Sequence, residues 1–136
     1  MNSQKVIVNG ILLRGDRVLI ARRALGKKIA TGKYHLPGGH VEFGEEPAEA
    51  VVREFREEFG LTVRVDSIFR TFSYVMGDTH TVGLTYLLSS DDTLDEITID
   101  PEDNDMVEWV GRADLEQYFD VRDHDRVTLE AYFKKL

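Results

Sequence analysis

Residues 39–61 read GHVEFGEEPAEAVVREFREEFGL, and this stretch governs the interpretation of the rest of the chain. If it forms a helix, the three- and four-residue offsets among Glu54, Glu57 and Glu58 place their carboxylates within an arc of about 100°. A separate arc carries apolar residues, namely Ala48, Val51, Val52, Phe55 and Phe59. The pattern predicts an amphipathic helix that packs with one face and presents acid on another.

Carboxylates crowded on one helix face repel one another, and each exposed pair costs roughly 0.2–0.5 kcal/mol. A hard divalent cation would offset this repulsion, because Mg²⁺ and Mn²⁺ prefer oxygen ligands, and Mg²⁺ joins carboxylates to substrate phosphates. The alternative is a solvated charged face in which Arg53 and Arg56 compensate the acids. Taken alone, the hexamer REFREE at 53–58 favours the solvated face.

A longer frame surrounds this hexamer. Gly39 stands six positions before Glu45, and the Arg-Glu pair at 53–54 begins eight positions after that. The Glu-Glu pair at 57–58 follows, and the Gly-Leu pair at 60–61 closes the frame. This frame resembles the signature of the Nudix hydrolases, G-x5-E-x7-R-E-U-x-E-E-x-G-U, in which U is a bulky apolar residue.

The resemblance extends beyond the frame. Phe55 and Leu61 occupy the two apolar places, and the lead-in LPGG at 36–39 and the run EWV at 108–110 are also similar to the family. The resemblance implies an α/β fold, the Nudix α/β/α sandwich with a mixed sheet, in which the signature forms a loop, a helix and a loop beside the sheet. It also implies a single Nudix hydrolase domain over residues 1–136.

Several positions in the frame have physical roles that do not depend on the family. Pro47 suits the first position of a helix, where its missing N–H costs nothing, and Gly60 suits the left-handed residue that ends one. Glu45 is expected to pair with Arg53 and so to fix the preceding loop against the helix. Glu46 replaces the Ser or Thr usual at the N-cap, which predicts a weaker helix start and unchanged chemistry.

The composition fits one soluble domain. A chain of 136 residues with 42% hydrophobic content is long enough for one core and too short for two ordinary domains. It contains no run of 18 apolar residues and no signal-peptide pattern. The absence of cysteine excludes disulfides, thiolate catalysis and zinc-thiolate sites, and a cytoplasmic location is the default expectation.

The charge distribution bears on the partners. The net charge of −8 disfavours binding to nucleic-acid polymers, which requires clustered Lys and Arg. Residues 91–105 carry eight acids and no base, whereas residues 1–33 hold eight bases against one acid, Asp16. The basic edge suits a small polyphosphate. We therefore expect a small nucleotide substrate, no nucleic-acid polymer and no membrane, with a homodimer as one assembly state left open.

Apolar, β-branched and aromatic segments separated by Gly-Asp turns at 15–16 and 77–78 predict two hairpins, one near the N-terminus and a longer one after the helix. The first pairs residues 5–13 with 17–22, and the second pairs 62–75 with 79–88. The remaining expectations are a loop at 26–32, strands at 33–36 and 106–110, a short helix near 114–119 and a helix over about 123–134. The residues expected to pack that last helix are Leu129, Tyr132, Phe133 and Leu136.

Five residues are candidates for substrate binding. Arg22 and Arg23 end a predicted strand, where they either contact substrate phosphate or are simply solvated. Tyr34 and His35 either flank a bound base or, as we favour, pack structurally. His124 precedes the final helix, and a His in this region contacts substrate in some Nudix enzymes.

The resemblance implies a reaction in which water attacks phosphorus in a nucleoside diphosphate linked to another group. It implies that Mg²⁺, with Mn²⁺ as a substitute, is held by Glu54, Glu57 and Glu58, and a glycine carbonyl at Gly39 is a further oxygen ligand. A bound cation neutralises phosphate oxygens and lowers the pKa of a bound water. Arg53 is grouped with the catalytic residues because it holds the loop.

The general base is left open between two glutamates. Glu58 is one candidate, and Glu102 in the acidic segment is the other, because PEDNDMVEWV at 101–110 resembles a segment of family members that act on the nucleotide pool. Glu102 would also serve as a metal ligand when substrate is bound. Asp103 and Asp105 compete with Glu102 for this role, and the alternative for the whole segment is solvated disorder.

Three functions are consistent with the sequence. The favoured one is a pyrophosphohydrolase that converts a nucleoside triphosphate, damaged or normal, to a monophosphate and pyrophosphate. The second keeps the chemistry but acts on ADP-ribose or a nucleotide sugar, and the short chain without an added dimerisation domain favours the first over it. The third is an inactive Nudix-fold module that binds nucleotide, which the complete set of carboxylates disfavours.

Overall fold

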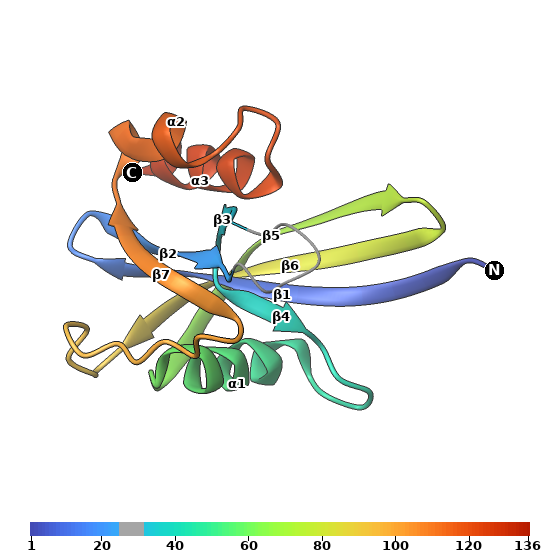
Figure 1. The fold of residues 1–136 in the computed structure, drawn as a ribbon, viewed down its shortest axis with the longest axis horizontal. Coiled ribbons are helices and arrows are strands. Elements are labelled where there is room, and N and C mark those ends of the chain that lie inside the picture. The colour runs from blue at the N-terminus through green and yellow to red at the C-terminus, as the bar shows by residue number, and fades with distance from the viewer. Residues whose placement is uncertain (25–31) are drawn as a thin grey trace. The chain divides into compact units, whose positions relative to one another are not determined.

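The structure is a computed structural model that describes residues 1–24 and 32–136 (Figure 1). The loop predicted at 26–32 therefore lies outside the described residues except for Gly32. The chain divides into two compact units. The first comprises Met1–Leu12 and Pro37–Thr98, and the second comprises Leu13–Leu36 and Ile99–Leu136.

A mixed sheet is the framework of the first unit. Its strands are β1 (Ser3–Arg14), β4 (Gly38–His40), β5 (Val63–Met76) and β6 (Thr79–Ser90), the last two residues of β1 belonging to the second unit. β1 runs parallel to β6, whereas β4 is antiparallel to β1 and β5 is antiparallel to β6. The predicted α/β class with a mixed sheet is confirmed.

β5 and β6 form the predicted long hairpin, visible in Figure 1 as two long neighbouring arrows. Gly77 has φ 63°, a left-handed conformation that glycine adopts without steric cost, and this allows the tight turn between the strands. β5 also shows register shifts between Val65 and Ser67 and between Ile68 and Arg70, as β-bulges produce. β5 begins and ends one residue later than the predicted range 62–75, and β6 extends two residues beyond the predicted end at residue 88.

β4 is a strand that the sequence does not predict, because glycine is depleted in strands. Gly38 lies opposite Asn9 and Gly39 lies opposite Val8. A Cβ at Gly38 would collide with backbone atoms of Val8 and Asn9, so only glycine permits this approach. Backbone pairing, rather than side-chain pattern, therefore brings the glycines into the sheet.

Helix α1 (Pro47–Phe59) has the predicted ends. Pro47 is its first residue, Glu46 caps it without a side-chain hydrogen bond, and Gly60 ends it at φ 67° and ψ 19°. The N–H of Gly60 donates to the carbonyl of Arg56 at 3.0 Å. Local sequence signals alone thus set both ends of the helix.

The buried face of α1 packs on the sheet of the first unit. Val51, Phe55 and Phe59 are fully buried, as predicted, while Ala48 and Val52 are only partly so. A Cβ at Gly10 of β1 would collide with Leu88 and press on the Phe55 ring, so this glycine lets the helix approach the sheet closely. Each fully buried large side chain contributes about 1.5–3 kcal/mol.

The second unit is built on an antiparallel sheet. The strands are β2 (Arg17–Arg23), β3 (Tyr34–His35) and β7 (Asn104–Val110), and β2 pairs with both others and with the end of β1. A 3₁₀ turn η1 (Arg112–Asp114), the short helix α2 (Leu115–Tyr118) and helix α3 (His124–Lys135) follow. Among the described residues, no helix is long and apolar enough to cross a membrane.

Helix α3 starts at a side-chain cap, because Asp123 accepts the N–H of Asp125 at 2.8 Å. Leu129, Tyr132 and Phe133 are buried, as predicted. Leu136 is 78% exposed, so the expectation that it packs is wrong. The helix ends at Lys135, and the final residue therefore leaves the packed face.

Candidate active site

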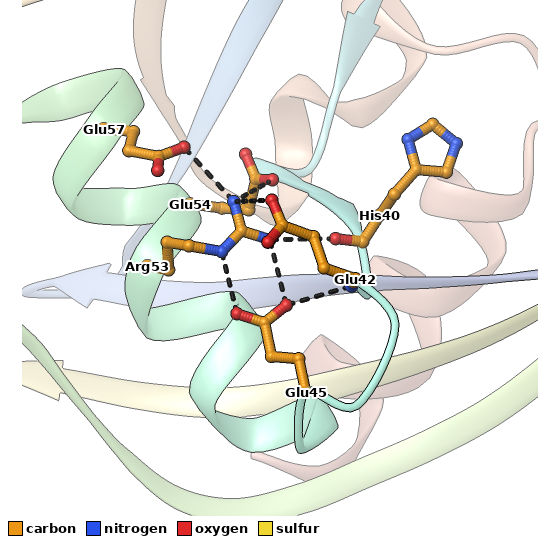
Figure 2. Close-up of polar contacts among 6 residues, drawn as sticks. All are labelled: His40, Glu42, Glu45, Arg53, Glu54 and Glu57. Carbon is orange, nitrogen blue, oxygen red and sulfur yellow. Dashed lines mark hydrogen bonds and ion pairs between the residues drawn. The ribbon is translucent and has the colours of Figure 1, made fainter.

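Arg53 is the centre of a polar network at the N-terminal part of α1 (Figure 2). Its Nε donates to Glu45 Oε2 at 2.8 Å and its Nη2 donates to Glu45 Oε1 at 3.1 Å. Nη2 also donates to the carbonyl of His40 at 3.0 Å. The guanidinium therefore joins the helix to the loop after β4, and the predicted pairing of Glu45 with Arg53 is confirmed.

The same guanidinium contacts acids that precede and follow it on the chain. Nη1 of Arg53 donates to Glu54 at 3.0 Å and to Glu57 at 3.2 Å, and it lies 3.7 Å from a carboxylate oxygen of Glu42. These contacts are additional to the predicted pair. One cation thus contacts four carboxylates, and its single charge offsets part of the repulsion among them.

This arrangement perturbs the ionisation of both partners. Hydrogen bonding to Glu45 raises the pKa of Arg53. The pKa of Glu45 is lowered first by its hydrogen bonds from Arg53 and then by the backbone N–H of Glu42, which donates to it at 3.1 Å. Glu45 is therefore ionised at neutral pH, and it ties both ends of the loop together.

Gly39 lies directly against the carboxylate of Glu54. A Cβ at position 39 would collide with that carboxylate, so the absence of a side chain makes the space in which Glu54 lies. Glu54 has a side chain only 15% exposed. The Gly39 backbone therefore lies beside the Glu54 carboxylate, and carbonyl and carboxylate oxygens are the donors that a hard divalent cation prefers.

The other two predicted metal ligands differ in exposure. The Glu57 side chain is 60% exposed, whereas Glu58 is buried at 7%. Within the part of the chain that the structure describes, no three acidic or histidine side chains already converge as a metal-binding group. At α1, Arg53 Nη1 donates to both Glu54 and Glu57. The oxygen-only donor set still fits Mg²⁺ or Mn²⁺ chemically.

In the second unit, Arg22 is held by an acid on the neighbouring strand. Its Nε donates to Asp105 Oδ1 at 2.7 Å, and this hydrogen bond raises the pKa of Arg22. Tyr34 lies opposite Arg22 in the β2–β3 register, and its hydroxyl donates to the sulfur of Met106 at 3.3 Å. Its ring meets Tyr118 edge-on at 4.9 Å. Arg22 and Tyr34 therefore lie together, both with protein partners.

His35 is tied into the second unit through both ring nitrogens. Nδ1 lies 2.9 Å from the carbonyl of Leu36, and Nε2 lies 2.9 Å from the amide oxygen of Asn104. Burial lowers the pKa of His35. These contacts favour the structural interpretation of His35.

The acidic segment makes local contacts of its own. Asp100 accepts the N–H of Glu102 at 3.0 Å, and the carbonyl of Asp103 accepts the N–H of Ala24 at 3.0 Å. Asp105 is engaged by Arg22, which makes it the weaker competitor for the role of general base. Glu102 is exposed. His124, the first residue of α3, is also exposed, and Arg23 follows a register shift in β2.

The sequence does not predict the contacts of two further acids, Asp125 in the second unit and Glu42 in the Arg53 network. Asp125 accepts the N–H of Leu36 at 2.9 Å, and enclosure of its carboxyl group raises its pKa to about 7. Glu42 joins the Arg53 network from the loop. Asp125 follows an N-cap residue by two positions, which marks a helix start but gives no sign of a contact 89 residues away.

Comparison with known proteins adds the family. A NUDIX domain model matches residues 3–132. The chain is 38% identical over 80 residues to the 8-oxo-dGTP diphosphatase of Escherichia coli (strain K12), a match covering 59% of this chain and 61% of that protein. It is 36% identical over 85 residues to the ADP-ribose pyrophosphatase of Methanocaldococcus jannaschii, covering 61% and 49% respectively. These matches span about half to three fifths of both relatives.

A longer match joins the chain to the nucleoside triphosphatase NudI of Escherichia fergusonii, with 31% identity over 124 residues, 85% of this chain and 87% of that protein. Among solved structures, the MutT protein from Methanosarcina mazei Go1 superposes with a TM-score of 0.83 at 18% identity, covering 98% and 96%. The MutT NUDIX hydrolase from Burkholderia pseudomallei gives 0.75 at 23%, covering 93% and 96%. The Nudix fold is thereby confirmed, and the chain belongs to the NUDIX domain family.

Proposed function

We propose that residues 1–136 form one Nudix hydrolase domain that cleaves a phosphoanhydride bond in a nucleoside diphosphate linked to another group. The observation that carries this proposal is the Arg53 network. A complete signature folds as loop, helix and loop, with Glu45, Glu54 and Glu57 held around one guanidinium and Gly39 against Glu54. The NUDIX domain model over residues 3–132 supports the domain assignment.

Glu54, Glu57, Glu58 and the carbonyl of Gly39 are the proposed ligands of Mg²⁺, for which Mn²⁺ substitutes. When bound, the cation neutralises phosphate oxygens and lowers the pKa of a bound water. Glu54 and Glu57, which contact Arg53 Nη1 in the structure, would hold the cation through their carboxylate oxygens. The bidentate bond to Glu45 uses the other two nitrogens of Arg53, so the loop stays anchored.

The hydrolysis needs an acceptor for the proton of the attacking water. Water forms the new bond to phosphorus, the bridging P–O bond breaks, and the leaving phosphate carries away the negative charge. Glu58, a buried carboxylate of α1, is one proposed acceptor. Glu102 is the other, and it is also proposed as a ligand that acts only when substrate is bound. Arg53 acts by positioning Glu45 and the loop.

For the substrate, we propose a nucleoside triphosphate, normal or damaged, converted to a monophosphate and pyrophosphate. One relative, whose match covers 85% of this chain, is named a nucleoside triphosphatase, and another is named an 8-oxo-dGTP diphosphatase. ADP-ribose or a nucleotide sugar is the second candidate, because one relative is named an ADP-ribose pyrophosphatase. Arg22, Arg23, Tyr34, His35 and His124 are kept as proposed substrate contacts. A cytoplasmic location and a homodimer complete the proposal.

A nucleotide panel tests the proposal. The protein is incubated with Mg²⁺ and nucleoside triphosphates, 8-oxo-dGTP, ADP-ribose and nucleotide sugars, and the products are separated by chromatography. Pyrophosphate from a triphosphate supports the favoured substrate, and AMP from ADP-ribose supports the second. Absence of turnover with every substrate and either cation would leave the chain as an inactive nucleotide-binding module.

A further inference from the structure

The end of the acidic segment, residues 100–104, is a hydrogen-bonded turn built on Asp100. The carbonyl of Asp100 accepts the backbone N–H of Asp103 at 3.1 Å and that of Asn104 at 3.0 Å. Its side chain accepts a third N–H, because Oδ1 lies 3.0 Å from the backbone nitrogen of Glu102. One residue therefore holds the N–H groups of residues 102, 103 and 104.

The local sequence favours this turn. Asp100 precedes Pro101, and proline suits the second position of a turn because its φ is fixed and its missing N–H is not needed there. An aspartate in the first position accepts the N–H two residues later through its side chain. The same combination of Asp and Pro begins many helices. The acids at 100–103 thus belong to a defined backbone conformation.

The far end of the turn is fixed to the strands of the second unit. The carbonyl of Asp103 accepts the N–H of Ala24 at 3.0 Å, and Asn104, the first residue of β7, lies opposite Arg23 of β2. The Asn104 residue is only 1% exposed, and its Oδ1 lies 2.9 Å from Nε2 of His35 in β3. The turn is therefore anchored through Asp103 and Asn104, independently of the Asp100 side chain.

Glu102 is the residue of this turn whose backbone depends on the Asp100 carboxylate. Asp103 and Asn104 use the carbonyl of residue 100, which every substitution keeps, whereas the N–H of Glu102 uses the side chain. Glu102 is exposed, so surrounding protein does not enclose its side chain. Loss of the Asp100 carboxylate would consequently loosen Glu102 while the rest of the turn keeps its hydrogen bonds.

We propose that Asp100 is a positioning residue for hydrolysis and that its carboxylate acts by fixing the backbone of Glu102. This inference rests on the proposed role of Glu102 as proton acceptor or substrate-dependent ligand. A displacement of about 1 Å costs a catalytic group about 100-fold in rate. Loss of one hydrogen bond leaves Glu102 in place for part of the time, so we expect a loss of about tenfold.

Steady-state kinetics with Mg²⁺ and the nucleotide that the natural protein hydrolyses fastest test the proposal. Asp100→Ala should lower kcat about tenfold and change KM less than about twofold. Asp100→Asn loses the same charge but keeps an oxygen that accepts the Glu102 N–H, so it should retain most of kcat. Glu96→Ala is the matched control, because it removes one exposed acid from the same segment, and it should keep the natural kcat.

A double-variant cycle separates positioning of Glu102 from a general structural role. In the Glu102→Gln background, the further change Asp100→Ala should lower kcat less than about twofold, because the group that it positions is already gone. Amide hydrogen exchange in the free protein, measured by nuclear magnetic resonance, gives a readout without substrate. The Glu102 amide should exchange about fivefold faster in Asp100→Ala than in the natural protein or Asp100→Asn.

Three results would overturn the positioning role while leaving the proposed hydrolysis intact. They are a natural kcat in Asp100→Ala, an equal loss in Asp100→Asn, and a full additional loss in the Glu102→Gln background. Unchanged exchange of the Glu102 amide in Asp100→Ala would also overturn it. A natural protein without turnover, or a Glu102→Gln variant with the natural kcat, would instead overturn the proposed function at Glu102 and this inference with it.

Discussion

Asp125 links the second unit's stability to pH. Its carboxyl group accepts the N–H of Leu36 at 2.9 Å, and enclosure by protein raises its pKa from 3.8 to about 7, with a smaller contribution from the charge of Asp123. Between these two values the folded protein holds a proton that the unfolded chain has released. Stability therefore falls as pH rises through this window and is fully present below it.

The size of this loss of stability follows from the width of the pH range between the unfolded and folded pKa values of Asp125. About two of its pKa units lie between pH 5 and pH 7, which corresponds to roughly 3 kcal/mol at about 1.36 kcal/mol per unit. Asp125 is half-buried as a residue, so we reduce this figure to allow for solvent screening. We therefore expect a loss of roughly 2 kcal/mol between pH 5 and pH 8 from this one group.

Asp125→Asn removes the titration and keeps the shape and the acceptor oxygen. Urea unfolding followed by circular dichroism at pH 5, 6, 7 and 8 gives the free energy of unfolding of both proteins. Between pH 5 and pH 8, the free energy of unfolding of the variant should rise by about 2 kcal/mol relative to that of the natural protein. Other titrating groups, His35 included, are common to both proteins and largely cancel in the difference. Parallel profiles would refute the reasoning, because the carboxyl would then be ionised in the folded state.

Three further predictions concern the proposed active site. Arg53→Ala should lower activity at least about tenfold and stability by roughly 2 kcal/mol, because it leaves Glu45 and Glu54 without their cation; lost activity at an unchanged melting temperature would make Arg53 a substrate contact instead. Gly39→Ala should weaken Mn²⁺ binding, measured by water proton relaxation, because the new Cβ displaces the Glu54 carboxylate; unchanged affinity would remove Glu54 from the metal site. Glu102→Gln should keep Mn²⁺ binding and lower turnover about ten- to a thousandfold, whereas Asp103→Asn should change turnover little. If both variants lost equal, small amounts of activity and added salt abolished the difference, the acidic segment would act only through its diffuse electrostatic field.

Local signals account for the part of the fold that the sequence predicts. Pro47 and Gly60 mark both ends of α1 because the conformations they favour are set within a few residues. The long hairpin follows in the same way from strand-forming residues on either side of Gly77. The pairing of Glu45 with Arg53 is also predictable, because a helix and the loop before it hold the two residues close.

The contacts that the sequence does not reveal depend on distant parts of the chain or on backbone approach. β4 forms because Gly38 fits against the backbone of β1, which no side-chain pattern signals. Asp105 is paired with Arg22, which lies 83 residues away in the sequence. The sequence around Asp105 shows only a run of acids, so it does not indicate this structural role. Arg53 also reaches Glu57, a contact that the helical arc of carboxylates does not by itself predict.

The central claim is that the α1 carboxylates bind the divalent cation that hydrolysis requires. Its most direct test is the rate of pyrophosphate release from a nucleoside triphosphate at saturating Mg²⁺, for Glu57→Gln against Glu49→Gln. Glu49 is an exposed acid in the first turn of the same helix, so both variants lose one charge from one element. Glu57→Gln should lower the rate on the order of a thousandfold while folding is kept, and Glu49→Gln should retain the natural rate. Near-natural turnover by folded Glu57→Gln would contradict the claim.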